Sequence, residues 1–164
     1  MVDLLWAPWR MEFIAGAREA GCLFCRTGRP GGDDAGNYVL WRGRLAFVML
    51  NRFPYSNGHL MVAPYRHEGA LANLGADEGA EMMAMAGRST AALEAALRAE
   101  GFNVGFNVGK VAGAGVQDHL HLHVVPRWAG DTNFLPVIAE TRVMPEYLEA
   151  TFEKLAPQFR GVGG

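Results

Sequence analysis

Three histidines occupy alternate positions in the second half of this 164-residue chain: His119, His121 and His123. Successive side chains of a β-strand point to opposite faces, so a strand here would place all three imidazoles on one face. Imidazole changes protonation near neutral pH and acts as a nucleophile, an acid–base group or a metal ligand. The spacing therefore predicts a reactive face or part of a metal site, and it disfavours a strand whose solvent face carries histidines by coincidence.

A glycine-rich segment, residues 107–115 (NVGKVAGAG), lies just upstream of the histidines. Small residues let backbone N–H groups approach a phosphate closely, and Lys110 adds a local positive charge. A glycine-rich loop alone is a weak signal. Because it precedes three histidines on one strand face, it predicts a phosphate site beside a nucleophile.

Cys22 and Cys25 are the only cysteines and form a C-x-x-C pair. Two thiols at this spacing supply half of a tetrahedral zinc site. A redox pair and two reduced, half-buried thiols are the alternatives. Two cysteines are too few for a disulfide framework, so the pair indicates a metal or redox role.

Composition excludes several classes of protein. Half of the residues are hydrophobic and 20% are charged, so a disordered chain is not expected. The formal net charge of −2 provides no global basic field, so nucleic acid is not an expected partner. No apolar run reaches the roughly 20 residues of a membrane span, and the N-terminus lacks the features of a signal peptide. We expect a cytoplasmic protein with no membrane partner.

The elements that would position these residues follow from the hydrophobic pattern. Strands are expected at residues 38–41, 45–50, 59–63, 102–108 and 119–125. A long alanine-rich helix is expected over residues 77–100 with Gly101 as its cap, and Pro145 opens a final helix that runs to about residue 155. Most strands follow one another through short connections, which predicts an α+β domain with a largely antiparallel sheet.

Several motifs together resemble the histidine triad (HIT) family. The run 119–125 (HLHLHVV) matches its signature, and residues 50–54 (LNRFP) and 57–64 (NGHLMVAP) match its usual upstream segments. Residues 5–10 (LWAPWR) and 124–134 (VVPRWAGDTNF) are similar to the diadenosine tetraphosphate phosphorylase and hydrolase-like branch. The similarity covers roughly residues 5–147. It implies the HIT-like fold, with a mainly antiparallel five-stranded sheet, one long helix and one C-terminal helix.

The length and the order of the elements along the chain predict a single compact unit with two parts. Residues 1–36 would form an N-terminal segment that carries the C-x-x-C zinc half-site, and residues 37–164 the HIT catalytic domain. Family members usually pair edge to edge into one continuous sheet, so we expect a homodimer.

Catalytic roles are carried over position by position. His121 would attack the α-phosphorus and form a nucleotidyl-histidine intermediate. His123 would bind the phosphate or leaving-group oxygen, and His59 matches an additional histidine that supports the site. The resemblance implies nucleotide binding by the following positions: Asn51, Asn107, Gly113, Ala114, Gly115 and Gln117. Many relatives have a polar side chain where this chain has Gly115, and Gln117 is the nearest substitute.

Zinc-containing relatives complete the C-x-x-C pair with two histidines. The matching residues are His67, in the segment 64–67 (PYRH), and His119, so the resemblance implies a structural zinc held by Cys22, Cys25, His67 and His119. In that case only His121 and His123 of the triad are left for chemistry.

The resemblance implies an enzyme that cleaves a diadenosine polyphosphate at the α-phosphate and passes the nucleotide to water or inorganic phosphate. Gly115 leaves the choice of acceptor open. A nucleoside phosphoramidase and a non-catalytic nucleotide- or zinc-binding protein are the alternatives. The expected ligand in every case is an adenine nucleotide or a dinucleoside polyphosphate.

Overall fold

The computed structural model describes residues 21–131 and 144–160. In chain order, these residues form α2 (Leu23–Thr27), β1 (Val39–Arg42), β2 (Ala46–Leu50), β3 (Leu60–Pro64), the 3-10 turn η1 (Leu71–Asn73), α3 (Ala76–Leu97), β4 (Gly101–Phe106), the 3-10 turn η2 (Lys110–Ala112), β5 (Leu122–Arg127) and α5 (Leu148–Phe159). The motif at residues 5–10 and the end of the motif at residues 124–134 lie outside the described residues.

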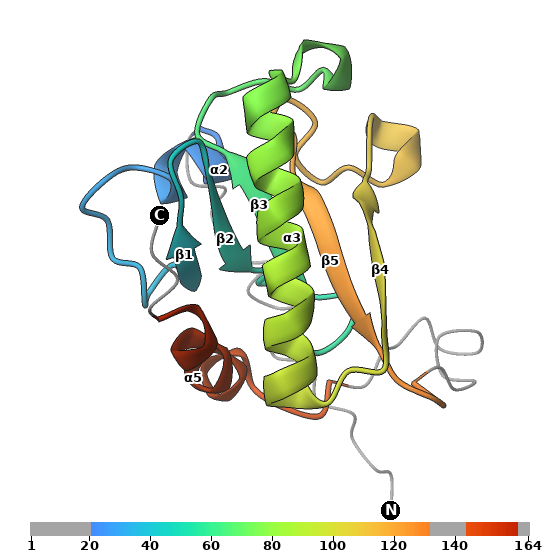
Figure 1. Ribbon diagram of the computed structural model, residues 1–164. Coiled ribbons are helices and arrows are strands. Elements are labelled where there is room, and N and C mark those ends of the chain that lie inside the picture. Colours follow the sequence, from blue (N-terminus) through green and yellow to red (C-terminus); the bar gives the residue numbers. More distant parts are fainter. Residues whose placement is uncertain (1–20, 132–143, 161–164) are drawn as a thin grey trace, which may run out of the picture.

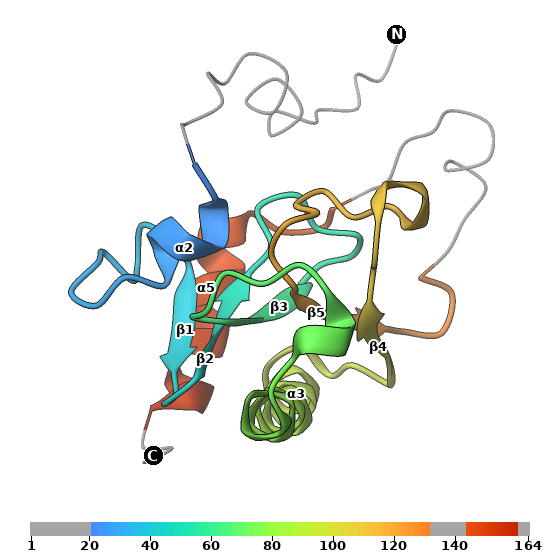
Figure 2. The same ribbon diagram turned by 90° about the horizontal axis from the view of Figure 1, so that it is seen from above.

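The five strands form one antiparallel sheet in the order β1-β2-β3-β5-β4. The long helix α3 crosses one face of this sheet, and α2 lies on the opposite face (Figures 1 and 2). The α5 helix packs beside α3 and against β1. Because β3 and β5 are neighbours, Met61 is the Cα partner of His123, and two segments far apart in sequence meet at the triad. The predicted α+β fold with a five-stranded, mainly antiparallel sheet is confirmed.

Alternation along the strands gives the sheet two buried faces. The face under α3 is closed by the buried side of this helix, which consists of Met82, Met85, Ala86, Ser89, Ala92 and Leu93. The opposite face buries a second cluster composed of Phe24, Val39, Phe47, Met49, Met61 and Ala63. Burying one such large apolar side chain stabilises the fold by about 1.5–3 kcal/mol. The three histidines share this second face with Phe24, so α2 packs where the chemistry is expected.

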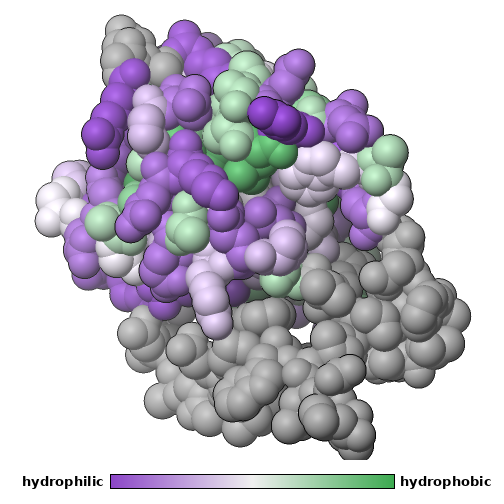
Figure 3. All heavy atoms as spheres, turned by 90° about the horizontal axis from the view of Figure 1, so that it is seen from below, coloured by the Kyte–Doolittle hydropathy of each residue, from purple (hydrophilic) through white to green (hydrophobic). Residues whose placement is uncertain are grey.

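Among the coloured residues on the face seen from below, most are hydrophilic, and a smaller group of hydrophobic residues lies near the upper centre of the view (Figure 3). Of the helices in the described parts of the chain, none combines the length and apolarity that crossing a bilayer requires.

The long helix ends earlier than the sequence pattern predicts. It stops at Leu97, and Arg98 takes the left-handed cap with φ of 55°, while Gly101 already belongs to β4. Tertiary contacts explain the difference. The Trp128 Nε1–H donates to the Leu97 carbonyl at 3.2 Å, and the Glu100 amide donates to the Arg127 carbonyl at 2.9 Å. Strand pairing to β5 therefore overrides the propensity of residues 98–100 for helix.

Three other predicted bounds shift. The strand expected at 119–125 is β5 (Leu122–Arg127), because Leu120 instead donates its amide to the Glu68 carbonyl at 2.7 Å, outside the ladder. The strand expected at 102–108 ends at Phe106, before the turn η2. The last helix spans Leu148–Phe159 rather than residues 145–155, and it accommodates Pro157 in its final turn.

Candidate active site and metal site

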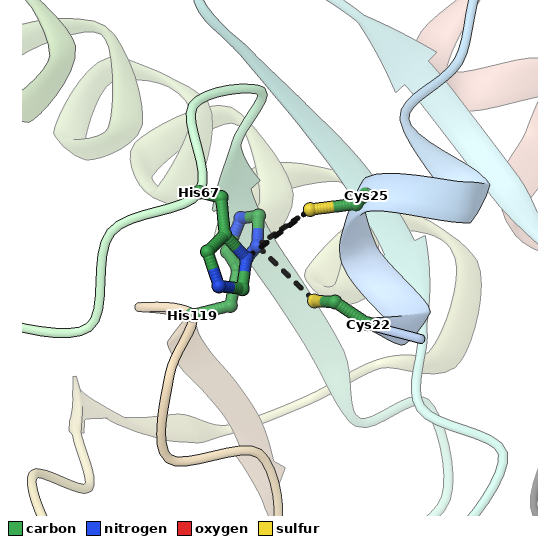
Figure 4. Close-up of side chains that lie close together, drawn as sticks. All are labelled: Cys22, Cys25, His67 and His119. Carbon is green, nitrogen blue, oxygen red and sulfur yellow. Dashed lines mark hydrogen bonds between the residues drawn. The ribbon is translucent and has the colours of Figure 1, made fainter. Parts of the chain in front are cut away.

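Two thiols and two imidazoles converge beside the start of β5. Cys22 precedes α2, Cys25 lies within it, His67 follows β3, and His119 precedes β5 (Figure 4). Their ligand atoms all lie within 4.8 Å of one another. The structure thus brings together all four side chains that the sequence suggests as metal ligands.

The spacing of the donors fits a tetrahedral ion. The Nδ1 atom of His119 lies 3.3 Å from the Cys22 sulfur and 3.5 Å from the Cys25 sulfur, and His67 Nδ1 lies 3.2 Å from the Cys25 sulfur. With Zn–S of about 2.3 Å and Zn–N of about 2.0 Å, sulfur and nitrogen ligands of a tetrahedral site are about 3.5 Å apart. Burial and the neighbouring Cys22 raise the pKa of the Cys25 thiol, an effect that a bound cation would reverse.

The tautomer of His119 suits a ligand role. Its Nε2 lies 2.8 Å from the Pro64 carbonyl oxygen, and a carbonyl can only accept, so Nε2 carries the proton. The Nδ1 lone pair therefore faces the two sulfurs. Burial lowers the pKa of His119, which keeps the ring neutral. A backbone carbonyl that fixes the second nitrogen is the usual support of a histidine ligand.

His121 has the opposite tautomer. Its Nδ1 lies 2.9 Å from the His119 carbonyl oxygen, so Nδ1 carries the proton and Nε2 has the free lone pair. Burial lowers the pKa of His121, partly offset by this hydrogen bond. At neutral pH the residue is therefore a neutral imidazole with an unprotonated Nε2, which is the form that a nucleophile requires.

A hydrogen-bonded chain fixes the tautomer of His123. The Tyr55 amide donates to His59 Nδ1 at 3.0 Å, so the proton of His59 sits on Nε2. That Nε2–H donates to His123 Nδ1 at 2.9 Å, which leaves His123 with its proton on Nε2. Burial, and next the charge of His121, lower the pKa of His123 to about 4. The buried Nε2–H of His123 has no hydrogen-bond partner among residues 21–131 and 144–160, so a donor is left available at the site.

The site thus pairs an acceptor with a donor. The rings of His121 and His123 are 4.8 Å apart, centroid to centroid, and nearly perpendicular at 67°. An unprotonated nitrogen on one ring beside an N–H on the other suits attack at a phosphorus atom whose oxygen needs a hydrogen-bond donor.

The predicted nucleotide-binding residues are placed unevenly. The Asn51 side chain accepts from the Phe53 amide at 2.9 Å and lies 3.3 Å from His59 Nδ1, next to the predicted catalytic histidines. Asn107 donates to the Tyr55 hydroxyl at 3.2 Å. In the loop before His119, Ala114 is buried and three positions are exposed: Gly113, Gly115 and Gln117.

Some backbone amides of that loop already donate hydrogen bonds within the loop. The Gly113 amide donates to the Lys110 carbonyl, and the Ala114 amide to the Gly109 carbonyl. Gly109 and Gly113 have φ values of 85° and 86°, which explains glycine at both positions. A phosphate at this loop would be bound by donors other than these two amides.

Sequence reasoning missed two aromatic residues. The Tyr55 ring stacks on His123 with centroids 5.6 Å apart, and Phe24 lies 5.2 Å from His119 and 4.7 Å from His121 by the same measure. Phe24 falls inside the C-x-x-C pair and Tyr55 four positions before His59. Phe24 thus lies within a recognised motif, and Tyr55 directly follows the segment 50–54, which was the one available signal.

Comparison with known proteins gives a consistent set of relatives. Residues 35–130 match the model of the HIT domain. A Mycobacterium tuberculosis protein named AP-4-A phosphorylase is 40% identical over 162 residues, which cover 94% of this chain and 83% of that protein. Adenosine 5'-monophosphoramidase of Schizosaccharomyces pombe is 24% identical over 139 residues, covering 85% of this chain and 98% of that protein. A solved structure, a zinc-bound histidine triad family protein from Mycobacterium smegmatis, is 28% identical with a TM-score of 0.68, covering 84% of this chain and 92% of that one.

Proposed function

Because this chain belongs to the HIT domain family, we propose that it is an enzyme that cleaves a dinucleoside polyphosphate at an α-phosphate through a covalent intermediate on His121. Similarity to the protein named AP-4-A phosphorylase favours diadenosine tetraphosphate as the substrate. The observation that carries the proposal is the pair of opposite tautomers on rings 4.8 Å apart, with a lone pair on His121 Nε2 and, on His123, an Nε2–H that no described residue accepts.

The reaction has two displacements. In the first, His121 Nε2 forms a bond to the α-phosphorus, and the bond from that phosphorus to the bridging oxygen breaks, so ATP leaves. The His123 Nε2–H donates a hydrogen bond to an oxygen of the reacting phosphate as negative charge moves. In the second displacement, water or inorganic phosphate attacks the same phosphorus and releases His121. The products with water are AMP and ATP, and those with phosphate are ADP and ATP.

The acceptor of the second step depends on the space near Gly115. Within the described part of the chain, a Cβ atom added at Gly115 would meet no heavy atom within 4 Å outside its chain neighbours. This open space admits either acceptor. Asn51, Asn107 and the segment from Gly113 to Gln117 are proposed to hold the nucleotide around the reacting phosphate.

We assign the four-ligand site to zinc, and the similarity to a zinc-bound family protein from M. smegmatis supports this choice of metal. Two thiolates and two neutral imidazoles form a closed set, so the ion would supply structure rather than a reactive water. Cys22 and Cys25 form no disulfide, which suits a reducing compartment such as the cytoplasm.

A second copy of this chain is the proposed partner at strand β4. This strand forms one edge of the sheet, and Val104 at its centre is 43% exposed. An open edge with an exposed apolar side chain favours pairing with another strand.

Product analysis with diadenosine tetraphosphate, with and without inorganic phosphate, tests the proposal. ADP and ATP formed only with phosphate identify a phosphorylase, and AMP and ATP formed under both conditions identify a hydrolase. Absence of product under both conditions would contradict the assigned substrate. A nucleoside phosphoramidase is the second candidate, favoured by the similarity to the S. pombe enzyme, and an adenosine phosphoramidate is the matched substrate for that assay.

A further inference from the structure

The metal site and the catalytic histidines are joined by one buried aromatic ring. Phe24 lies between the two cysteines in sequence, is 1% exposed, and belongs to the cluster beneath the triad face. Its ring centroid is 4.7 Å from that of His121, with the planes inclined by 31°. The residue thus touches the proposed nucleophile from the α2 side.

His121 is therefore in contact with two aromatic rings. Phe24 lies against it at a shallow angle, and His123 lies 4.8 Å away, nearly perpendicular. Rotation of the imidazole about the Cβ–Cγ bond would break the hydrogen bond from Nδ1 to the His119 carbonyl and turn Nε2 away from the substrate. Contact with the two rings restricts that rotation, and small errors in the position of a reacting atom lower rates strongly.

The position of Phe24 depends in turn on how α2 is anchored. This helix has five residues, too few for an independent helix in water. Two anchors are seen. The sulfurs of Cys22 and Cys25 approach His119 and His67, and the Arg42 side chain donates to the Thr27 and Gly28 carbonyls at 2.9 and 3.1 Å.

We infer that Phe24 is a positioning residue for His121, and that the metal site supports catalysis by holding α2 so that the Phe24 ring fixes the nucleophile. This inference rests on the proposed role of His121. It differs from a purely structural role for the metal, because the effect of the ion on turnover would then depend on the Phe24 side chain.

The test uses Phe24→Leu with Phe47→Leu as the matched control. Both residues are fully buried in the same cluster, but the Phe47 ring stacks on Tyr65 at 5.5 Å instead of on a histidine. We expect Phe24→Leu to lower kcat about tenfold with KM changed less than about twofold, and zinc content to stay at the wild-type level. Both variants are expected to lower Tm by a similar amount. Phe47→Leu is expected to leave kcat near the wild-type value. Equal kcat values in the two variants would overturn the inference.

Removal of zinc by a chelator is a second test of the inference. If Phe24 carries the coupling, removing zinc lowers the kcat of the wild-type protein but changes that of Phe24→Leu little further. A chelation effect of the same size in both proteins would assign the coupling to the His119 carbonyl and overturn the role of Phe24.

NMR spectroscopy of the histidines is a third test, which does not depend on turnover. In zinc-loaded protein with ¹⁵N-labelled histidine, His121 should show one tautomer with the proton on Nδ1, assigned by loss of its signals in His121→Gln. Phe24→Leu should shift these signals toward a mixture of tautomers, and Phe47→Leu should not. An unchanged His121 spectrum in Phe24→Leu would contradict the inference even if diadenosine tetraphosphate is not the substrate. If Phe24→Leu does not fold, Phe24→Met replaces it, because methionine adapts to irregular core space.

Discussion

The proposed metal cluster and the proposed catalytic pair, His121 and His123, both use histidines from the same short run of chain, yet His119 and His121 present opposite nitrogens. His119 donates through Nε2 to the Pro64 carbonyl and turns Nδ1 toward two sulfurs. His121, two positions later, donates through Nδ1 to the His119 carbonyl and keeps Nε2 free. A backbone acceptor decides in each case which nitrogen is left, so the backbone around the triad sets which nitrogen is available to the proposed metal or to the proposed reaction.

The two regions also differ in what their nitrogen and sulfur atoms can bind. The four atoms of the metal cluster are all suited to bind one cation, and His67 among them is exposed. The catalytic pair offers one acceptor and one donor from buried rings. Substitutions that affect one region and spare the other therefore test whether the regions have separate roles.

The largest effect is expected for His121→Ala. Loss of the nucleophile should reduce kcat by on the order of 10⁴-fold or more, as for other covalent catalysts. AMP affinity, measured by calorimetry, should change only a few-fold, and zinc content should remain at the wild-type level. Turnover within tenfold of the wild-type value would show that His121 is not the nucleophile.

His59→Leu should have the next largest effect. It removes the Nε2–H that fixes His123, so both tautomers of His123 become populated and its donor is no longer held at the site. We expect kcat to fall by about 10²-fold, with zinc content unchanged. The steady-state rate should be compared with that of His123→Leu, and additive losses in the double variant would argue against a shared function of the two residues.

His67→Ala breaks the metal cluster from its exposed side and leaves the catalytic hydrogen bonds in place. Zinc content should drop well below that of the wild-type protein, and Tm should fall by about 5–15 °C because metal binding contributes to folding. Metal analysis and thermal unfolding measure the two effects. Unchanged Tm with loss of metal would mean that the ion does not stabilise the fold.

The smallest effect concerns the dependence of stability on pH. The pKa of His123 is lowered from 6.5 to about 4 by burial, so the unfolded chain binds a proton that the folded chain does not between these values. The free energy of unfolding should therefore decrease as pH falls from 6.5 to 4, with no contribution from His123 to the slope above that window. Urea denaturation of the wild-type protein and His123→Gln should show a shallower slope for the variant, and equal slopes would contradict this burial effect.

Much of this comparison could be predicted from sequence. The alternating histidines indicated a functional strand, and resemblance to the HIT family supplied Cys22, Cys25, His67 and His119 as one metal set. Each of these signals is local or tied to a motif. The element types also follow from local pattern, and the main error, the end of α3, arises where contacts of Trp128 and Arg127 override helix propensity.

The rest depends on three-dimensional contacts that carry no local pattern. The tautomers of His121 and His123 are set by a carbonyl and by the Tyr55 amide, and a backbone group is present at every position of any sequence. The packing of Phe24 on His121 joins residues 97 positions apart. Asn51, expected to bind the nucleotide, also contacts His59 through an amide that sequence alone cannot orient.

The most direct test of the central claim is to trap the covalent intermediate. Protein mixed with excess diadenosine tetraphosphate is quenched on the millisecond scale in alkaline denaturant, because phosphorus–nitrogen bonds are labile in acid, and its peptides are analysed by mass spectrometry. An adenylyl group on the peptide that holds His121, absent in His121→Ala, is the predicted result. Product formation with no adduct, or with the adduct on a different residue, would contradict the account.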